Sequence, residues 1–485
     1  MSLSDIVTSA YDLLLFIIAL YSFHRLVIIW RFYRHRHLLS EPQRYYADKQ
    51  LPKITVQLPI FNEMYVVERL LQAVAQLNYP PDKLEIQVLD DSTDETQTVC
   101  RQQIQQLKQQ NLDIHHIHRQ QRQGFKAGAL AHGLTMATGE LVAIFDADFV
   151  PPPDTLIKMV HYFSDPQVGM VQARWEHLNR SYSTLTELQA LMLDGHFVAE
   201  QTSRSRTGCF FNFNGTAGIW RIKAITDSGG WMHSTVTEDL DLSYRAQIKG
   251  WQCIYLPDIR VPAELPMEMN SFKSQQFRWA KGSSQVAKLM LSSITRADLP
   301  AYIKWEAFFH LTNNFNYLLM LLLLLLSLPY QFYVDYDWPY ALFFYGPLSL
   351  STSLSVVSFY LIAQRKSDDN WLSWELIQNL MLLMGVGIGL SINQSLAVCD
   401  GLLRSDTDFV RTPKHGVIGA SEKWIDKKYR AAKNWVLYLE LLMMVYLVLT
   451  IAIALTNHHY FSLPFLILFL TGYIYTFSLS VFQTR

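Results

Sequence analysis

The sequence predicts an α/β domain, built on a mixed Rossmann-like sheet, that is joined to a set of membrane-spanning helices. The 485 residues are 50% hydrophobic, and the apolar residues gather in blocks close to the ~20 residues that cross a bilayer. Between the first block and the others, residues 51–305 alternate short apolar runs with helical patterns, as α/β sheets do. The formal net charge of -1 gives no general basic field, so nucleic acid is not expected as a partner.

The N-terminal segment, residues 1–50, is expected to hold a membrane anchor and a basic cytosolic linker. Its apolar stretch at 6–30 is followed by Arg31, Arg34 and Arg36. Because the basic residues come second and no small-residue cleavage site is present, an anchor is favoured over a secretory signal. The positive-inside rule then predicts an outside N-terminus and a cytoplasmic domain at 51–305. The four cysteines form no CxxC pair, which fits a reducing compartment.

Residues 51–305 begin with four predicted strands and a helix. The runs at 54–58, 85–89, 114–118 and 141–145 are apolar or β-branched, and 63–77 has helical periodicity. Asp90 and Asp91 follow the second run, and Asp146 follows the fourth. Because ligands of such sheets bind beyond the carboxyl ends of the strands, these carboxylates mark the expected site.

Residues 306–485 are predicted to form the C-terminal membrane region. Candidate spans lie at 309–334, 341–363, 376–398, 436–455 and 461–481. Basic stretches around Arg365 and Lys427 flank the third candidate, and both look cytoplasmic. We therefore predict that residues 374–400 form an interfacial or re-entrant segment, because polar amides and three glycines are tolerated at that depth inside protein or along a cavity. A full crossing, with Arg365 outside, is the alternative.

Glu440 stands at the edge of a predicted span. It is expected to extend toward the interface or to pair with Lys433. An intramembrane carboxylate that lines a pore is the alternative.

Asp146 and Asp148 are spaced i, i+2 at the end of a strand, so their carboxylates project toward the same side. Mg2+ and Mn2+ take oxygen ligands and bridge substrate phosphates through one or two carboxylates. A metal-held diphosphate is the functional interpretation, and a pair of turn residues is the structural one.

Asp90 and Asp91 are expected to face the nucleotide, while Ser92 or Thr93 caps the following helix. Lys126 stands at a helix start rich in small residues, which suits close approach of an anionic ligand. A surface lysine is the simpler interpretation of Lys126 taken alone.

Asp239 supplies a third carboxylate, in Thr237-Glu238-Asp239. Direct displacement at a sugar carbon needs a base for the acceptor hydroxyl, and Asp239 is the candidate. Neighbouring like charges raise the pKa of such a carboxyl, although a bound metal opposes that shift. Glu238 and Asp241 are weaker candidates.

Gln275, Arg278 and Trp279 share one face of a predicted helix. Arg278 can bind phosphate through two hydrogen bonds, and Trp279 offers a flat apolar surface for a sugar ring. The alternative is a packing tryptophan beside an arginine at the membrane interface.

In order, these motifs resemble the processive, inverting members of glycosyltransferase family 2, which include cellulose, hyaluronan and chitin synthases. The resemblance is closest to plant cellulose-synthase-like mannan and xyloglucan-backbone synthases. It covers nearly the whole chain, and it is also carried by Phe213-Asn214-Gly215-Thr216-Ala217-Gly218-Ile219-Trp220-Arg221, Gly229-Gly230-Trp231, Glu238-Asp239-Leu240-Asp241-Leu242 and Glu264-Leu265-Pro266. It implies a GT-A catalytic domain at 51–305.

The resemblance also implies a role for each motif residue. The diphosphate and a Mg2+ or Mn2+ ion would be held by Asp146 and Asp148, and Asp239 would be the catalytic base. Phe409 to Lys414 is similar to the gating loop of cellulose synthases, here at 404–420. The nucleotide-binding residues would be Asp90, Asp91, Lys126, Gln275, Arg278, Thr412 and Lys414. The acceptor-binding residues would be Phe213, Asn214, Gly215, Thr216 and Trp279.

The implied activity is transfer of a sugar from a nucleotide sugar to a growing β-linked polysaccharide that passes through the protein's own helices. UDP-glucose is the first expectation for the donor and GDP-mannose the second. The expected partners are the donor, a glycan acceptor and a plasma-membrane or Golgi-type bilayer. The chain stops shortly after its last span, so no cyclic-dinucleotide-binding domain is expected. The alternatives are a single transfer to a ceramide or polyprenyl-phosphate lipid and a catalytically silent scaffold or channel.

Overall fold

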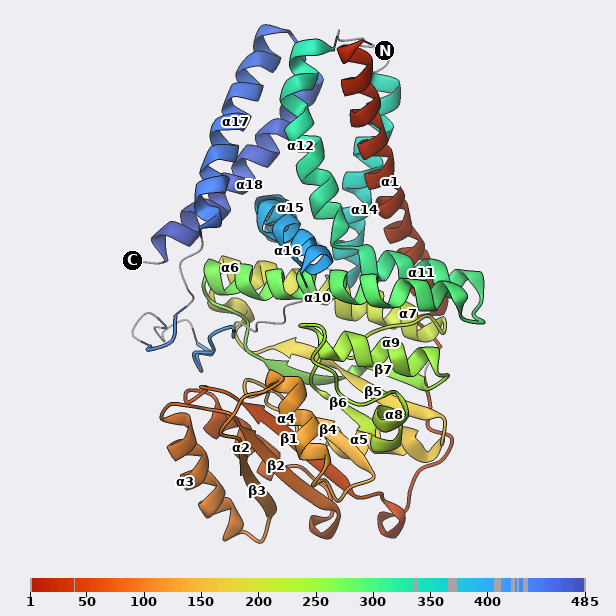
Figure 1. The fold of residues 1–485 in the computed structure, drawn as a ribbon, viewed down its shortest axis with the longest axis vertical. Helices are drawn as coiled ribbons and strands as arrows, with labels where there is room; N and C mark the ends of the chain where they lie inside the picture. Colours follow the sequence, from red (N-terminus) through yellow and green to blue (C-terminus); the bar gives the residue numbers. More distant parts are fainter. Residues whose placement is uncertain are drawn as a thin grey trace.

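The computed structural model describes residues 2–38, 40–334, 339, 341–364, 373–404, 411–419, 424, 427–430 and 435–483. Figure 1 shows long helices at one end of the molecule, the sheet at the other, and a layer of helices between them. Four residues used in the sequence argument, Arg365, Phe409, Val410 and Lys433, lie outside the described residues.

A mixed seven-stranded sheet organises the polar domain, as predicted, in the order β3-β2-β1-β4-β6-β5-β7. The first four strands are parallel. The sixth runs antiparallel to β4 and β5, and β7 is parallel to β5. The strands are β1 (Ile54–Ile60), β2 (Leu84–Asp90), β3 (Asp113–His118), β4 (Leu141–Ile144), β5 (Val168–His177), β6 (Gly218–Arg221) and β7 (Gln252–Ala263).

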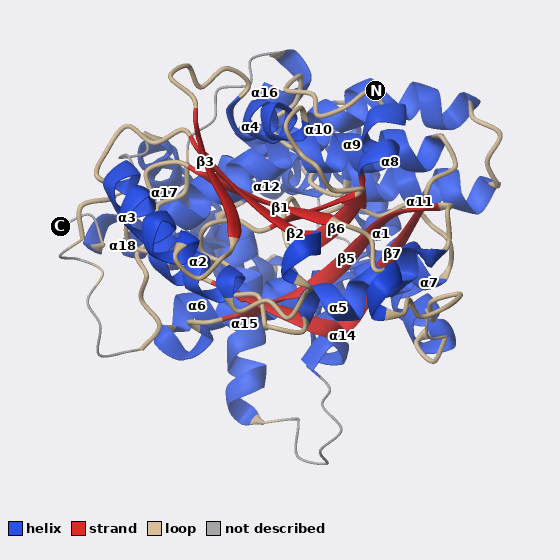
Figure 2. Ribbon diagram, turned by 90° about the horizontal axis from the view of Figure 1, so that it is seen from below, coloured by secondary structure: helices blue, strands red, loops and turns tan. Residues whose placement is uncertain are grey.

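Helices cover both faces of this sheet (Figure 2). On one face α2 (Val67–Ala75), α3 (Thr96–Lys108) and α5 (Thr155–Val160) pack on β1 through a core that includes Val56 and Leu70. On the other face α4 (Phe125–Leu134), α8 (Ile222–Asp227) and α9 (Glu238–Ile248) enclose a second core around Trp220. Short helical turns are η1 (Asp48–Gln50), η2 (Pro81–Lys83), η3 (His161–Ser164) and η4 (Arg180–Tyr182).

Two local predictions differ from the structure. The helix expected at 63–77 begins only at Val67, because Asn62 adopts a φ of 54° and residues 64–66 form a turn. The first turn of α3 is capped neither by Ser92 nor by Thr93. Instead the carboxylate of Asp94 accepts a hydrogen bond from the backbone N–H of Thr96 at 3.0 Å.

A layer of helices separates the sheet from the long apolar helices. It contains α6 (Thr184–Asp194), the π-helix η5 (Gly195–Gln201), α7 (Thr202–Arg206), α10 (Met269–Arg296) and α11 (Ala301–Thr312). The longest of these, α10, carries the Gln275 to Trp279 motif along the boundary between the two regions (Figure 1).

Five helices among the described residues are long and apolar enough to cross a membrane. They are α1 (Leu3–His35), α12 (Phe315–Tyr333), α14 (Gly346–Gln364) with the π-helix η6 (Ala341–Tyr345), α17 (Val436–Thr456), and α18 (Leu463–Phe482) with η7 (Tyr460–Ser462).

The segment predicted to be interfacial forms two helices, α15 (Trp374–Gly389) and α16 (Ser391–Leu403), which are bent by 47° at their junction. Figure 1 shows them between the long helices and α10. The amide of Asn393 donates to the backbone carbonyl of Lys273 on α10 at 3.0 Å, so this polar side chain of α16 is paired inside the protein. That this segment is interfacial or re-entrant and does not cross the bilayer stays a prediction.

Glu440 does not extend toward the interface, so that prediction is wrong. Its side chain is fully buried, and its two carboxylate oxygens lie 2.6 and 2.9 Å from Nζ of Lys273 on α10. Lys273 also donates to the hydroxyl of Ser480 on α18 at 2.8 Å. A buried ion pair therefore ties the α10 boundary helix to two of the apolar helices.

Candidate active site

One pocket is lined by carboxylates and by lysine and arginine side chains from distant parts of the chain. It lies beyond the carboxyl ends of β2 and β4, between the start of α9 and one face of α10. The predicted site residues that line it are Asp91, Lys126, Asp146, Asp148, Asn214, Gly215, Asp239, Gln275, Arg278, Trp279, Thr412 and Lys414. The sheet thus brings together most of the motifs.

Asp146 and Asp148 each face a lysine. Nζ of Lys126 lies 2.5 Å from Oδ1 of Asp146, and Nζ of Lys414 lies 2.5 Å from Oδ2 of Asp148. No group of three or more His, Cys, Asp or Glu side chains in the described part of the chain could hold a metal ion. Two carboxylates at one strand end nevertheless fit Mg2+ or Mn2+, which completes its coordination with phosphate oxygens and water.

Asp90 and Asp91 play different structural parts. Asp90 is completely buried and does not line the pocket; its carboxylate faces Nε2 of His116 at 2.8 Å and accepts from the backbone of Ser92 at 2.9 Å. Asp91 lines the pocket and accepts from Nε of Arg119 at 2.8 Å. The structure therefore brings one of the two predicted nucleotide-binding carboxylates to the pocket, and the other supports the loop behind it.

The start of α9 places Glu238 and Asp239 in the same pocket as the carboxylates of Asp146 and Asp148. Burial, and next the charge of Glu238, raise the pKa of Asp239 to about 7 against the opposing charge of Lys126. The pKa of Glu238 is also raised, mainly by burial. A carboxylate in this state is basic enough to accept a proton near neutral pH.

We expect the rate of any proton-accepting reaction at Asp239 to rise with pH through about 7. Below that pH the carboxyl already carries a proton, so the rate should fall by about tenfold per pH unit. Initial rates measured at saturating substrate from about pH 5.5 to 8.5 check this expectation. A rate that stays flat or falls across that range would contradict the role of Asp239 as a base.

The Phe213 to Thr216 loop contributes two residues to the pocket and two behind it. Asn214 and Gly215 line the pocket. Phe213 is buried against Trp220 with ring centroids 5.8 Å apart, and the buried Thr216 accepts from the backbone of Asp146 at 2.8 Å. A Cβ added at Gly215, which has a φ of +81°, would lie 2.9 Å from Oδ2 of Asp239. Glycine therefore lets this loop approach the candidate base.

Gln275, Arg278 and Trp279 turn one face of α10 toward the pocket. Arg278 lies 3.4 Å from the hydroxyl of Thr412. Trp279 also packs on the core around Trp220. Its ring is therefore held in place at the edge of the pocket.

The segment 411–419 lies against the pocket and is held there by hydrogen bonds and an ion pair. The buried carboxylate of Glu264 accepts from the backbone N–H of His415 at 2.8 Å and of Gly416 at 2.9 Å. Arg411 pairs with Glu63 at 3.4 Å. Burial raises the pKa of Glu63 to about 7, although Arg411 opposes the shift.

Sequence reasoning missed Glu63 and His116; Glu264 was visible only as part of the Glu264-Leu265-Pro266 motif.

Comparison with known proteins gives consistent results. Residues 52–282 match the profile described as glycosyltransferase like family 2. Glucomannan 4-beta-mannosyltransferase 2 of Arabidopsis thaliana is 43% identical over 255 residues, which are 52% of this chain and 48% of the relative. Glucomannan 4-beta-mannosyltransferase 1 of Cyamopsis tetragonoloba is 38% identical over 303 residues, 61% of this chain and 58% of the relative. The chain thus spans about half the length of these curated relatives.

Among solved structures, a mannosyltransferase from Pyrobaculum calidifontis in complex with GDP-Man and Mn2+ is similar with a TM-score of 0.53 and 22% identity. The match covers 73% of this chain and 97% of that chain. At this identity the likeness concerns the fold.

Proposed function

We propose, on the premise that residues 52–282 match the profile of glycosyltransferase like family 2, that the chain is a membrane-embedded, metal-dependent inverting glycosyltransferase that extends a β-linked polysaccharide. One observation carries the proposal. The Asp146 and Asp148 pair, Asp239, and the Arg278 and Trp279 face of α10 line a single pocket, and α10 belongs to the layer of helices between the sheet and the apolar helices (Figure 1). Such an arrangement can bind a nucleotide sugar and activate an acceptor hydroxyl in the same place.

We infer that the donor is GDP-mannose, ahead of UDP-glucose. The sequence alone favoured UDP-glucose. The order changes because the curated relatives at 38–43% identity are glucomannan 4-beta-mannosyltransferases. The product would then be a β-1,4-linked mannan or glucomannan, and UDP-glucose becomes the second donor to test.

The proposed reaction is a single displacement at the anomeric carbon. The carboxylate of Asp239 accepts the proton of the acceptor hydroxyl while that oxygen attacks the carbon. The bond from this carbon to the diphosphate breaks, its electron pair leaves with the nucleotide diphosphate, and the configuration inverts. A metal ion held by Asp146 and Asp148 would neutralise charge on the leaving group, and Arg278 would bind its oxygens. Trp279 would support the acceptor sugar ring.

In this proposal the catalytic domain lies in the cytoplasm, the N-terminus lies outside, and segment 411–419 acts as part of a gating loop. Two features support the gating role. Thr412 and Lys414 line the same pocket as the carboxylate pair. The carboxylate of Glu264 accepts hydrogen bonds from the backbone of the next two residues of this segment. Residues 374–400 would lie at the membrane interface, next to α10. A glycan would pass from there between the apolar helices.

Removal of divalent metal is expected to abolish transfer. Without a cation, Lys126 and Lys414 balance the negative charge of Asp146 and Asp148. The negative charge of the diphosphate then has no metal ion to offset it. Excess EDTA should lower the initial rate by at least about 100-fold, and Mn2+ or Mg2+ added beyond the chelator should restore it. An unchanged rate in EDTA would argue against the assignment of Asp146 and Asp148.

The donor and product can be tested together. Purified protein in lipid nanodiscs is incubated with GDP-mannose, UDP-glucose and other nucleotide sugars plus Mn2+ or Mg2+, while nucleotide release and product size are followed. We expect GDP release and a polymer that a β-mannanase degrades. One sugar on an extractable lipid would instead support the single-transfer alternative. Release of no nucleotide from any donor would contradict the enzyme proposal and favour a scaffold or channel.

A further inference from the structure

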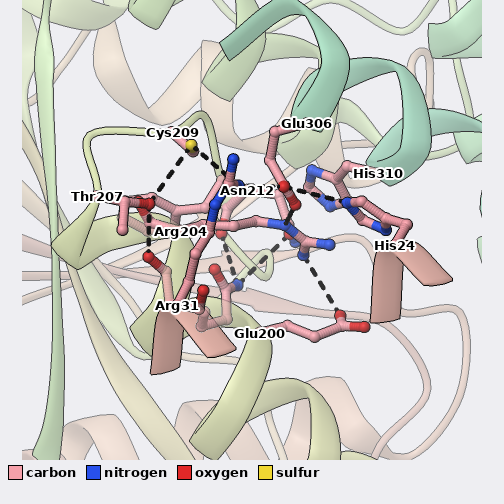
Figure 3. A network of polar contacts seen from close by, with 12 residues as sticks. His24, Arg31, Glu200, Arg204, Thr207, Cys209, Asn212, Glu306 and His310 are labelled. Atoms are coloured by element: carbon pink, nitrogen blue, oxygen red, sulfur yellow. Dashed lines mark hydrogen bonds and ion pairs between the residues drawn. The ribbon is translucent and has the colours of Figure 1, made fainter. Parts of the chain in front are cut away.

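Charged side chains from α1, α7 and α11 meet in one network (Figure 3). Glu306, on α11, is its centre and is almost completely buried. Its carboxylate binds Arg31 and, at 3.1 Å, His24, both from α1. The other oxygen lies 3.1 Å from Nε of Arg204 on α7. Three separate helices thus meet at one carboxylate.

The network of charged side chains continues from Arg204 into the π-helix η5. NH1 of Arg204 lies 3.3 Å from Oε2 of Glu200. The same oxygen lies 3.0 Å from Nδ1 of His196. Nε2 of His196 lies 3.2 Å from Oδ1 of Asn214, and Asn214 lines the pocket. The network therefore ends on a predicted acceptor-binding residue.

The surroundings fix which end of the Asn214 amide faces the protein. Nδ2 of Asn212 donates to the backbone carbonyl of Phe213 at 3.2 Å and to Oδ1 of Asn214 at 2.8 Å. Nε2 of Gln201 donates to the backbone carbonyl of Asn212 at 3.1 Å and to Oδ1 of Asn214 at 3.3 Å. Because carbonyl oxygens only accept, both neighbours must present nitrogen, and the Asn214 atom that they meet must be oxygen.

The amide nitrogen of Asn214 is consequently turned away from these donors. Nδ2 is buried and has no hydrogen-bond partner in the structure. An unpaired buried donor is unfavourable, so a hydrogen-bond partner supplied by a ligand would stabilise the bound state. The next residue, Gly215, approaches Oδ2 of the candidate base Asp239. A ligand that reaches Asn214 therefore lies on the side of the pocket where the acceptor hydroxyl must be.

His196 bridges Glu200 and Asn214. Nδ1 faces the Glu200 carboxylate, while Nε2 lies 3.2 Å from Oδ1 of Asn214 and 3.3 Å from Nε2 of Gln201. The other ionisable groups beside this pair include Arg204, His310 and Tyr360. Burial opposes ionisation of Glu200, but Arg204 and His196 outweigh it and lower its pKa. Burial lowers the pKa of His310 well below its usual value.

We propose that His196 is a positioning residue: held by Glu200, it keeps the Asn214 amide nitrogen directed into the pocket, where that nitrogen donates to an oxygen of the acceptor sugar. The inference rests on the proposed function. Glu306 and Arg204 hold Glu200 in place and so anchor this orientation to α1. His196 itself does not touch the reacting atoms.

The test compares steady-state kinetics of wild type with His196→Ala, Asn214→Ala and the double variant, using GDP-mannose and β-1,4-mannohexaose as acceptor. Loss of one hydrogen bond of about 1.4 kcal/mol should raise the acceptor KM by about tenfold, with donor KM unchanged. Because both changes remove the same contact, the double variant should also be raised by about tenfold and not by 100-fold. His132→Ala, at an exposed histidine on α4 outside the pocket, should match wild type.

A second variant keeps the test decisive if His196→Ala fails to fold. Glu200→Gln retains an oxygen that accepts from Nδ1, so its acceptor KM should stay within about twofold of wild type, whereas Glu200→Ala removes that oxygen and should raise the acceptor KM by about tenfold with donor KM unchanged. Additive effects in the double variant, or equal acceptor KM values for Glu200→Gln and Glu200→Ala, would overturn the inference alone. Absence of turnover by the wild-type protein with every donor would instead overturn the proposed function, and with it this role.

Discussion

The Asp239→Asn variant is expected to lose sugar transfer by about 10^2- to 10^4-fold, the usual contribution of a general base. Asparagine preserves the size of the side chain but cannot accept the proton of the acceptor hydroxyl. The loss should fall on kcat, because the side chain that changes is not the one expected to bind the nucleotide. Initial rates with saturating donor and acceptor, followed by nucleotide release, provide the measurement.

Two controls show whether that loss is chemical. Binding of GDP to Asp239→Asn, measured by calorimetry with Mn2+, should lie within about threefold of wild type. Asp227→Asn changes an exposed carboxylate at the end of α8, and it should leave the rate within about twofold. If Asp239→Asn retained more than about a tenth of the wild-type rate, another residue would have to be the base, and Glu238 would be examined next.

The Glu306→Ala variant is expected to lower the free energy of unfolding by about 3–5 kcal/mol. Removal of this carboxylate takes away the oxygen that Arg31 binds and one of the two carboxylates that Arg204 binds. The apparent Tm in detergent should fall by roughly 3–5 °C if the whole chain unfolds together. Scanning fluorimetry of purified protein measures the shift.

The matched control breaks an exposed ion pair. Lys428 and Glu95 lie 2.8 Å apart, with side chains 54% and 62% exposed, so Glu95→Gln should leave the apparent Tm nearly unchanged. Equal shifts for Glu306→Ala and Glu95→Gln would show that the buried network contributes little.

The pH dependence of the Glu306 contribution follows from its pKa. Burial would raise it, but His24, Arg204 and Arg31 lower it from 4.5 to about 2. A group with a lowered folded pKa stabilises the protein above its unfolded value. This contribution is therefore fully present at neutral pH and is lost only as the pH falls from about 4.5 toward 2.

Several parts of the fold and site could be predicted because their signals are local. The β-branched runs around Val56 and Val142 gave the positions of strands in a mixed sheet. Carboxylates that directly follow such runs must lie at the carboxyl edge, as Asp146 and Asp148 do. The helical spacing of Gln275, Arg278 and Trp279 likewise predicted one shared face, and all three line the pocket.

Other predictions failed where side-chain direction depends on the pairing of distant segments. Adjacent residues at a strand end point to opposite sides, so Asp90 and Asp91 cannot both face the pocket, and β3 supplies His116 as the partner of the inner one. Phe213, in the loop before β6, lies in the core beside Trp220. Glu440 found a partner on α10, 167 residues away.

The sequence by itself determined that this protein has a carboxylate-rich α/β domain between apolar helices, because strand ends, helical faces and long apolar runs are properties of short segments. Only the tertiary structure decided which of those carboxylates share a pocket and how the domain is joined to α1. Glu306, Arg204, Glu200 and His196 carry no motif, and their contacts cross up to 282 residues of chain. Burial makes these charges depend on one another, since each needs a partner that only the folded chain can bring within reach.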